Sequence, residues 1–288
     1  MTQQNTWNIV QADGGLGISW NKIIRGESKY IMCGSNGYIA ISDDLINWEL
    51  QIVGKGDRNW NSITMCESGN NFTYVICGSK GDIAYTFDLV KWFVIPIHDK
   101  SLNDVKYNFD KCYVCGHGYL GISEDLKFWN NVIAVENMIL NCMCVGFIGY
   151  THKSVAAFGI GNKTVIVVCR YDSIHEKEIQ NVNNKISNYI SVTCNYRLGD
   201  IYLCDRHGKN IKLNRYMRKK SSRYHELHDD DYMVDSAHDG NNFIILSSFG
   251  YIYGRTTEEK IPGDIRWNAI CVNQGVRIVC GVGYVAYM

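Results

Sequence analysis

The sequence has little of several features that would assign its class at once. Its 288 residues include only two prolines, and 29 basic residues balance 29 acidic ones. A net charge of zero provides no field that would attract nucleic acid or an anionic membrane, so neither is expected as a partner. No apolar run approaches the roughly 20 residues of a membrane span. Residues 1–5 lack the basic start and apolar core of a secretory signal, which predicts synthesis and folding in the cytoplasm.

The 12 cysteines are too small a share of the chain for a disulfide scaffold. Four of them directly precede a glycine in an apolar run: Cys33, Cys77, Cys115 and Cys280. We expect these to be reduced, buried thiols. Cys112 and Cys115 have the spacing of a zinc pair, but residues three apart in a strand point to opposite faces. Cys142 and Cys144 share a face, yet no second Cys/His pair lies at finger spacing, so neither a metal nor a cofactor is expected.

Short apolar or alternating runs between 27 glycines predict strands, and no stretch keeps a helical period for three turns. Self-comparison then shows a repeat. Trp20-Asn-Lys-Ile-Ile recurs with variation from Trp60, Leu102 and Trp267. A second element, Tyr30-Ile-Met-Cys-Gly, is followed by a third of the type Gly37-Tyr-Ile-Ala-Ile-Ser, and both recur at the same places in the later copies.

Three copies end in Ser/Thr-x-Asp-Leu-x-x-Trp, which predicts a tight turn between antiparallel strands. The residues concerned are Ser42, Asp44, Trp48, Thr86, Asp88, Trp92, Ser123, Asp125 and Trp129. In such a turn the Asp carboxylate accepts backbone N–H bonds and the hydroxyl closes the other side. The Trp covers the turn and holds the hairpin register. We favour this structural interpretation over a catalytic role for the three aspartates.

Four strands in about 40 residues match the dimensions of a β-propeller blade. The sequence therefore predicts an all-β, single-domain propeller over residues 1–288, with seven four-stranded blades. The predicted blade starts lie near residues 20, 60, 102, 139, 188, 232 and 267. Because the last unit lacks a strand and the N-terminal segment has one to spare, residues 6–11 are expected to complete the last blade and remove two open sheet edges.

These units resemble the BNR or Asp-box repeats of sialidases, of photosystem II assembly factor-like propellers and of many phage tail proteins. The family turn reads Ser-x-Asp-x-Gly-x-Thr-Trp. Here the glycine is missing and the tryptophan comes one residue earlier. The clear resemblance covers residues 20–134 and 266–288, and it implies the fold, which hosts enzymes, scaffolds and binding modules alike.

A sialidase-like glycoside hydrolase or lyase is one alternative that this resemblance raises. Such a site needs three arginines around a carboxylate and a Tyr/Glu pair. The candidate arginines occupy no common position in the repeat: Arg25, Arg58, Arg170, Arg197 and Arg277. No catalytic residue is therefore predicted.

Two features could bind a partner. Asparagines recur at one position of the innermost strands: Asn21, Asn61, Asn103, Asn141 and Asn268. They either line the channel as a ring or cap their own strands through local backbone bonds, and we favour the capping interpretation. The second feature is a basic block, and five of its residues form a candidate docking patch: Arg215, Arg218, Lys219, Lys220 and Arg223. The alternative is a solvated loop neutralised by Glu226 and residues 229–231.

The sequence thus favours a non-enzymatic interaction or receptor-binding propeller whose partners are other proteins of a larger assembly. The short turn most resembles propellers of phages and phage-derived particles, which implies a tail or baseplate component of a virion or tailocin-like particle. A lectin-like propeller that binds cell-surface glycan through rim Trp or Tyr residues is the second alternative.

Overall fold

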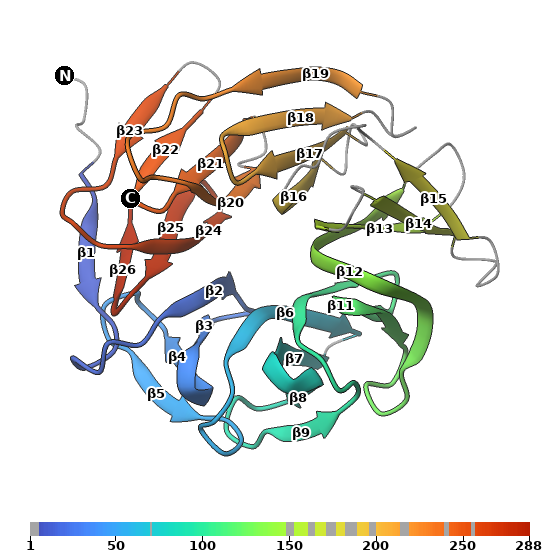
Figure 1. The fold of residues 1–288 in the computed structure, drawn as a ribbon. Coiled ribbons are helices and arrows are strands. Elements are labelled where there is room, and N and C mark those ends of the chain that lie inside the picture. The colour runs from blue at the N-terminus through green and yellow to red at the C-terminus, as the bar shows by residue number, and fades with distance from the viewer. Residues whose placement is uncertain are drawn as a thin grey trace.

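The computed structural model describes residues 6–69, 71–147, 153–160, 165–170, 177–181, 189–195, 200–213, 219–238, 242–254 and 257–288. These residues form a ring of antiparallel sheets, a β-propeller (Figure 1). Two 3₁₀ turns, Ser35–Gly37 and Ser79–Gly81, interrupt the described strands. Within the described ranges, no helix is long and apolar enough to cross a membrane.

Five blades have four strands each, and we name each blade by its innermost strand. Innermost first, the β2 blade comprises β2 (Trp20–Arg25), β3 (Tyr30–Gly34), β4 (Tyr38–Ser42) and β5 (Glu49–Ile52), and the β6 blade comprises β6 (Trp60–Ser68), β7 (Asn71–Gly78), β8 (Asp82–Thr86) and β9 (Phe93–Pro96). The β16 blade comprises β16 (Tyr189–Asn195), β17 (Asp200–Asp205), β18 (Lys209–Leu213) and β19 (Lys219–Tyr224), and the β20 blade comprises β20 (Met233–His238), β21 (Phe243–Ser247), β22 (Tyr251–Tyr253) and β23 (Glu258–Lys260). The β24 blade comprises β24 (Trp267–Asn273), β25 (Val276–Gly281), β26 (Tyr284–Tyr287) and β1 (Asn8–Gln11).

The β10 blade has six strands, so the described residues form six blades and the predicted number of seven was wrong. It comprises β10 (Leu102–Asn108), β11 (Lys111–Ser123), β12 (Asn130–Phe147), β13 (Lys153–Ile160), β14 (Val165–Arg170) and β15 (Lys177–Asn181). The predicted start at residue 139 falls inside β12. Residues 130–145 contain neither glycine nor proline, the strongest markers of a turn, and the strand continues from the outside of the ring to its centre (Figure 1).

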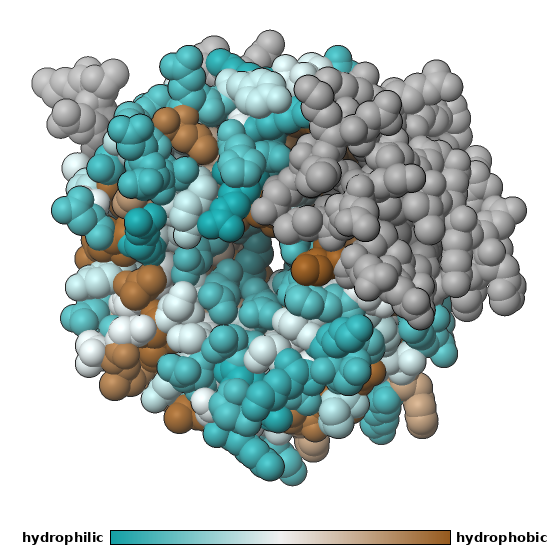
Figure 2. Space-filling model, viewed as in Figure 1, coloured by the Kyte–Doolittle hydropathy of each residue, from teal (hydrophilic) through white to brown (hydrophobic). Residues whose placement is uncertain are grey.

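The six blades therefore present seven inner segments to the centre: β2, β6, β10, the C-terminal half of β12, β16, β20 and β24. Each inner segment contacts the next, and β24 contacts β2, so the ring is closed. Figure 2 shows the ring hollowed at its centre, with mainly hydrophilic residues around the opening.

The N-terminal strand completes the β24 blade, as the sequence predicts. Asn8 pairs with Tyr287 and Gln11 with Tyr284, so β1 is the outermost strand beside the C-terminal strands. Trp7 and Tyr284 pack against the same apolar cluster. The Trp7 indole also donates to Glu259 of the β20 blade at 2.7 Å, which fastens the chain end to a neighbouring blade.

The hydrophobic core lies mainly between neighbouring blades. One cluster joins Ile31 and Ile39 of the β2 blade to Trp60 of the β6 blade, and another joins Leu246 of the β20 blade to Trp267 of the β24 blade. Trp20, Trp60 and Trp267 are fully buried. Burial of this kind stabilises the ring rather than any single sheet, because each blade supplies one wall of two clusters.

Candidate functional site

Every inner segment begins with a β-bulge. Trp20 pairs with Gly34 and Lys22 with Cys33, so Asn21 has no opposite residue in the ladder. The same skip after the first residue occurs in all the other inner segments. A bulge leaves one residue outside the ladder and re-aims its side chain. In five of the seven inner segments the residue outside the ladder is the recurrent asparagine.

The glycine of each Cys-Gly pair lies opposite the bulge. A Cβ on Gly78 would lie 2.2 Å from the carbonyl oxygen of Asn59, the residue before β6. Equivalent distances at the other three glycines are 2.5, 2.2 and 2.1 Å, for Gly34, Gly116 and Gly281 respectively. Trp-Asn and Cys-Gly are therefore two halves of one close backbone crossing, which explains why they occur together in the sequence.

The five asparagines form a belt around the channel in which each carboxamide is bonded to the next inner segment. Each Nδ2 donates to the carbonyl of that segment's first residue, at 2.8–3.0 Å, in the pairs Asn21 to Trp60, Asn61 to Leu102, Asn103 to Leu140, Asn141 to Tyr189 and Asn268 to Trp20. We call these five residues the carboxamide belt.

The belt corrects one of the two sequence-based alternatives. The side chains do line the channel. Their bonds go to a neighbouring segment, so the alternative that each Asn caps its own strand was wrong. Sequence could not reveal this, because the accepting carbonyls lie 37–48 residues ahead or, for Asn268, 248 residues back. Ile190 and Val234 hold the asparagine position in β16 and β20, which leaves the belt open there.

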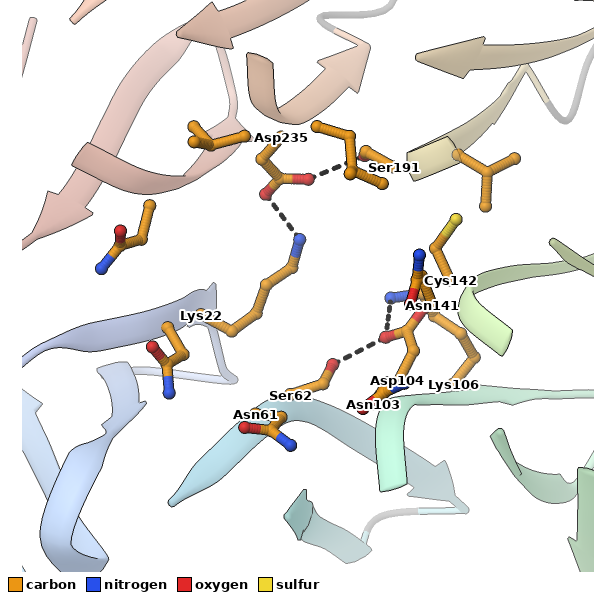
Figure 3. A pocket seen from close by; sticks show the side chains of 15 residues that line it. Lys22, Asn61, Ser62, Asn103, Asp104, Lys106, Asn141, Cys142, Ser191 and Asp235 are labelled. Carbon is orange, nitrogen blue, oxygen red and sulfur yellow. Dashed lines mark hydrogen bonds and ion pairs between the residues drawn. The ribbon is translucent and has the colours of Figure 1, made fainter. Parts of the chain in front are cut away.

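Below the belt, two buried aspartates hold a network of charges that the sequence analysis missed (Figure 3). Asp235 accepts from Lys22 at 2.6 Å and from the Ser191 hydroxyl at 2.8 Å. Asp104 accepts from Lys106 at 3.0 Å and from the Ser62 hydroxyl at 2.7 Å.

Each of these carboxylates also accepts a backbone N–H from the next inner segment. The Met143 N–H donates to Asp104 at 3.0 Å and the Ile270 N–H to Asp235 at 3.1 Å. A buried charge is tolerated only when it is paired and hydrogen-bonded in this way. The available signal was the position two residues after the first residue of each inner segment, where charged residues occur in three of the seven copies: Lys22, Asp104 and Asp235.

The channel cavity is small and polar. Its volume is about 110 Å³, which accommodates a side-chain tip or a few water molecules but not a folded segment. Burial by itself lowers the pKa of Lys106, but the Asp104 carboxylate outweighs it and the pKa is raised. Lys106 therefore stays charged and paired. Amides, hydroxyls and neutralised ion pairs equip the cavity to form hydrogen bonds rather than to donate or remove protons.

The three Asp turns lie at the opposite ends of the blades from the bulges. In the first, the Asp44 carboxylate accepts the N–H groups of Ile46 and Asn47, both at 2.8 Å. The Ser42 hydroxyl accepts the Leu45 N–H at 2.9 Å, and the Trp48 indole donates to the Leu45 carbonyl at 3.1 Å. The same backbone bonds recur around Asp88 and Asp125.

The backbone conformation of one turn residue was not anticipated from the sequence. The leucine after each aspartate has a positive φ: 67° at Leu45, 60° at Leu89 and 63° at Leu126. This conformation is costly for any residue with a Cβ, which comes too close to the following carbonyl oxygen, and it usually calls for glycine. Here Leu45 is 4% and Leu89 8% exposed. Burial of Leu45 and Leu89 offsets this backbone strain.

The Asp turns predict an acid-sensitive fold. Backbone N–H groups, led by those of Asn47, Lys91 and Phe128, hold the pKa of Asp44, Asp88 and Asp125 below its usual range. A carboxyl group whose pKa is lower in the folded than in the unfolded state stabilises the fold at pH values above about 4, the ordinary pKa of Asp. That contribution is lost as the pH falls through the folded-state pKa.

We therefore expect urea midpoints to fall below about pH 4. The fall should be shallower in a triple variant carrying Asp44→Asn, Asp88→Asn and Asp125→Asn. Asp43→Asn is the matched control, since its carboxylate bonds the Lys29 side chain instead of the turn backbone. Equal acid sensitivity in the triple variant and the wild type would contradict the role given to these carboxylates.

The predicted docking patch is only partly within the described residues. Arg215 and Arg218 lie outside them, as does the side chain of Lys219. Lys220 ion-pairs with Asp200 at 2.8 Å, and Asp200 also accepts from Lys212 at 2.8 Å. Burial raises the pKa of Asp200, but the two lysines outweigh it and the pKa is lowered. An acid within the same blade therefore neutralises part of the block, while Arg223 lies exposed on β19.

The cysteines considered for a metal site and the arginines considered for a sialidase site have other environments in the structure. Ten of the twelve cysteines have described side chains; nine of these ten are buried, and all ten are free. Burial raises the pKa of the Cys33 thiol to about 12, which makes it a poor nucleophile or metal ligand. Over the described part of the chain, no group of three His, Cys, Asp or Glu side chains could hold a metal ion.

Three of the arginines considered for a sialidase site have separate partners. Arg58 ion-pairs with Asp82 at 2.9 Å, Arg277 pairs with Glu259 at 3.0 Å, and Arg25 lies over the Tyr30 ring. Arg197 and the side chain of Arg170 lie outside the described residues.

The sequence matches no protein-family model and no curated protein. The fold, in contrast, is similar to solved propellers. A structure of YCF48 bound to D1 peptide has a TM-score of 0.74 at 13% identity, over 99% of this chain and 95% of that chain. The WD40 β-propeller domain of Doa1 has a TM-score of 0.69 at 11% identity, over 94% of this chain and 96% of that chain. At such identities the likeness shows the fold alone, and by that fold this chain is a β-propeller.

Proposed function

We propose that this chain is a non-enzymatic interaction propeller that holds a segment of a partner protein over the channel. The binding surface is the mouth face, defined as the loops that enter the inner segments together with the turns that follow the second strands. The observation that carries the proposal is the carboxamide belt, because each Asn is bonded to a neighbouring segment and the polar mouth is held rigid before anything binds. Preorganisation lowers the entropic cost of association.

Two further observations support binding rather than catalysis. Both channel carboxylates are already neutralised by lysines, so no acid or base is poised for proton transfer there. Among solved structures of similar fold, that of YCF48 has a peptide bound. Loops from every blade converge on one face of a propeller, which makes such faces suited to recognising an extended segment.

We further propose that the partner belongs to a larger assembly, a phage tail, baseplate or tailocin-like particle. The short Ser/Thr-x-Asp-Leu-x-x-Trp turn supports this setting through its resemblance to propellers of that origin.

Site-specific photo-crosslinking tests the binding surface. A photoreactive residue at Asn36, exposed in a turn of the mouth face, should capture one partner protein from the native source. The same residue at Glu49, exposed on the outer strand β5, is the matched control and should capture none. Mass spectrometry identifies the product, and a particle protein is the expected result. Equal capture from both positions, or from Glu49 alone, would place binding elsewhere and reject the mouth face.

A further inference from the structure

Two backbone positions of each blade surround the mouth: the residue before the inner segment and the residue after the second strand. Backbone bonds join them, as from Ser79 N–H to the Asn59 carbonyl at 2.9 Å and from Val282 N–H to the Arg266 carbonyl at 2.9 Å. The Met233 N–H likewise donates to the Arg206 carbonyl, as the Trp267 N–H does to that of Ser248. Arg206 and Ser248 therefore occupy the same position of the repeat.

In the β2, β6 and β10 blades these positions carry small or neutral polar residues: Ser19, Ser35, Asn59, Ser79, Ser101 and His117. Two arginines depart from that pattern on the opposite part of the ring, Arg206 in the β16 blade and Arg266 before β24. Both are exposed. We call them the arginine pair.

Each guanidinium of the pair is held on an aromatic ring. Arg206 lies 4.2 Å from the centroid of Tyr232, and Arg266 lies 3.9 Å from that of Phe249. Stacking fixes a planar guanidinium while its N–H groups remain available in the plane. Across the described residues, neither arginine has a carboxylate within ion-pair distance.

The two arginines belong to one continuous surface around Ser248. The Ser248 N–H donates to the Tyr232 carbonyl at 2.8 Å, and the Ser248 hydroxyl accepts from Arg266 at 3.2 Å. That hydroxyl also donates to Asp231 at 2.8 Å, and the Phe249 N–H donates to the same Asp231 oxygen at 3.0 Å. These bonds engage Oδ1 of Asp231, while its Oδ2 is buried and has no hydrogen-bond partner among the described residues. Asp229 and Asp230 lie in the loop from β19 to β20, and Asp264 lies two residues before Arg266 in the loop from β23 to β24.

Apolar residues accompany the arginine pair where the carboxamide belt is open. Val234 follows Met233, whose N–H bonds the Arg206 carbonyl, and Ile190 is its counterpart in β16. Val282 is 39% exposed and bonds the Arg266 carbonyl. This part of the mouth therefore combines stacked positive charge with aliphatic surface.

We infer that the arginine pair binds a carboxylate of the partner segment, and that this segment is an acidic peptide with an apolar residue beside its carboxylate. The inference rests on the proposed function and specifies its partner. Planar guanidiniums match a carboxylate through two parallel N–H bonds, and an aliphatic neighbour would cover Val234 and Val282. The zero net charge of the chain opposes an extended phosphate polymer, which needs a continuous basic surface.

An array of short synthetic peptides tests the inference without knowledge of the partner. The peptides of the array differ independently in their acidic and in their apolar content. Every acidic peptide has an amide counterpart in which asparagine and glutamine replace aspartate and glutamate. The wild type should bind peptides that have an apolar residue beside an acidic one, and it should not bind their amide counterparts. Its binding of the acidic peptides should weaken at high salt. The double variant Arg206→Glu and Arg266→Glu should weaken this binding at least about tenfold.

Lys55→Glu is the matched control, because Lys55 is exposed on the same face at the other side of the ring. It should change binding less than about twofold. Arg206→Lys should have an intermediate effect, since it keeps the charge but loses the planar stack. Thermal unfolding of each variant separates loss of binding from loss of fold.

Equal binding of amide counterparts, preference for an oligonucleotide over every peptide, or an unaffected double variant would overturn the inference. Crosslinking from Asn36 that persists in the double variant would leave the proposed function intact while rejecting the arginine pair. Absence of any captured partner would reject the proposed function itself.

Discussion

Replacing Trp60 by alanine should lower the free energy of unfolding by about 4 kcal/mol. Trp60 is fully buried and packs with Ile31 and Ile39 of the β2 blade as well as Ile76 of its own blade. Its removal opens a cavity between two blades. Neighbouring strands are held in a closed ring and can relax only partly, so most of the lost contact area stays lost. Urea unfolding monitored by far-ultraviolet circular dichroism measures the change.

Trp60→Phe is the matched control. The indole Nε1 of Trp60 is buried and has no hydrogen-bond partner among the described residues. Phenylalanine keeps most of the apolar ring and removes that unpaired donor, so the expected cost is only about 1 kcal/mol. Equal costs for the two variants would mean that packing between blades is not what Trp60 contributes.

Gly78→Ala should cost about 3 kcal/mol, although alanine adds a single methyl group. Its Cβ would lie 2.2 Å from the Asn59 carbonyl oxygen and 2.9 Å from the Trp60 ring. The first of these atoms is backbone, so relief requires the bulge and the belt above it to shift. We expect a lower urea midpoint and faster amide hydrogen exchange in β6 and β7.

Gly275→Ala separates crowding from backbone strain. Gly275 has a φ of +86° but no atom within 4 Å of a built Cβ, so only the cost of a left-handed residue remains, about 1 kcal/mol. A Gly78 variant as stable as the Gly275 variant would show that the close backbone crossing is not a constraint.

The strands and turns of the repeats were predictable because their causes are local. Glycines mark turns, Asp44 and its equivalents bond N–H groups two and three residues ahead, and Trp48 bonds the leucine three residues back. Six of the seven predicted blade starts lie within one residue of the start of an inner strand. The exception is residue 139. It lies in a segment without glycine or proline, where spacing alone could not show that the strand is continuous.

The candidate site was predictable only in part. The recurrence of asparagine identified the belt residues, but not the carbonyls that they bond. Asp104 and Asp235 went unnoticed because aspartate occupies their shared position in only two of the seven inner segments. Arg206 and Arg266 were likewise missed, because one lies in a basic block and the other lies just before the repeat residue Trp267, 60 residues further along the sequence.

Local chemistry alone thus specified the four-stranded units, the Asp turns, the buried thiols and the strand that the N-terminus lends to the C-terminal blade. Ring closure decided the rest. It selected which carbonyl each asparagine meets, joined Lys22 to an aspartate 213 residues away, and stacked Arg206 and Arg266 on aromatic rings of neighbouring loops. Such contacts depend on how sheets pack around an axis, and that packing is a property of the whole chain rather than of any of its repeats.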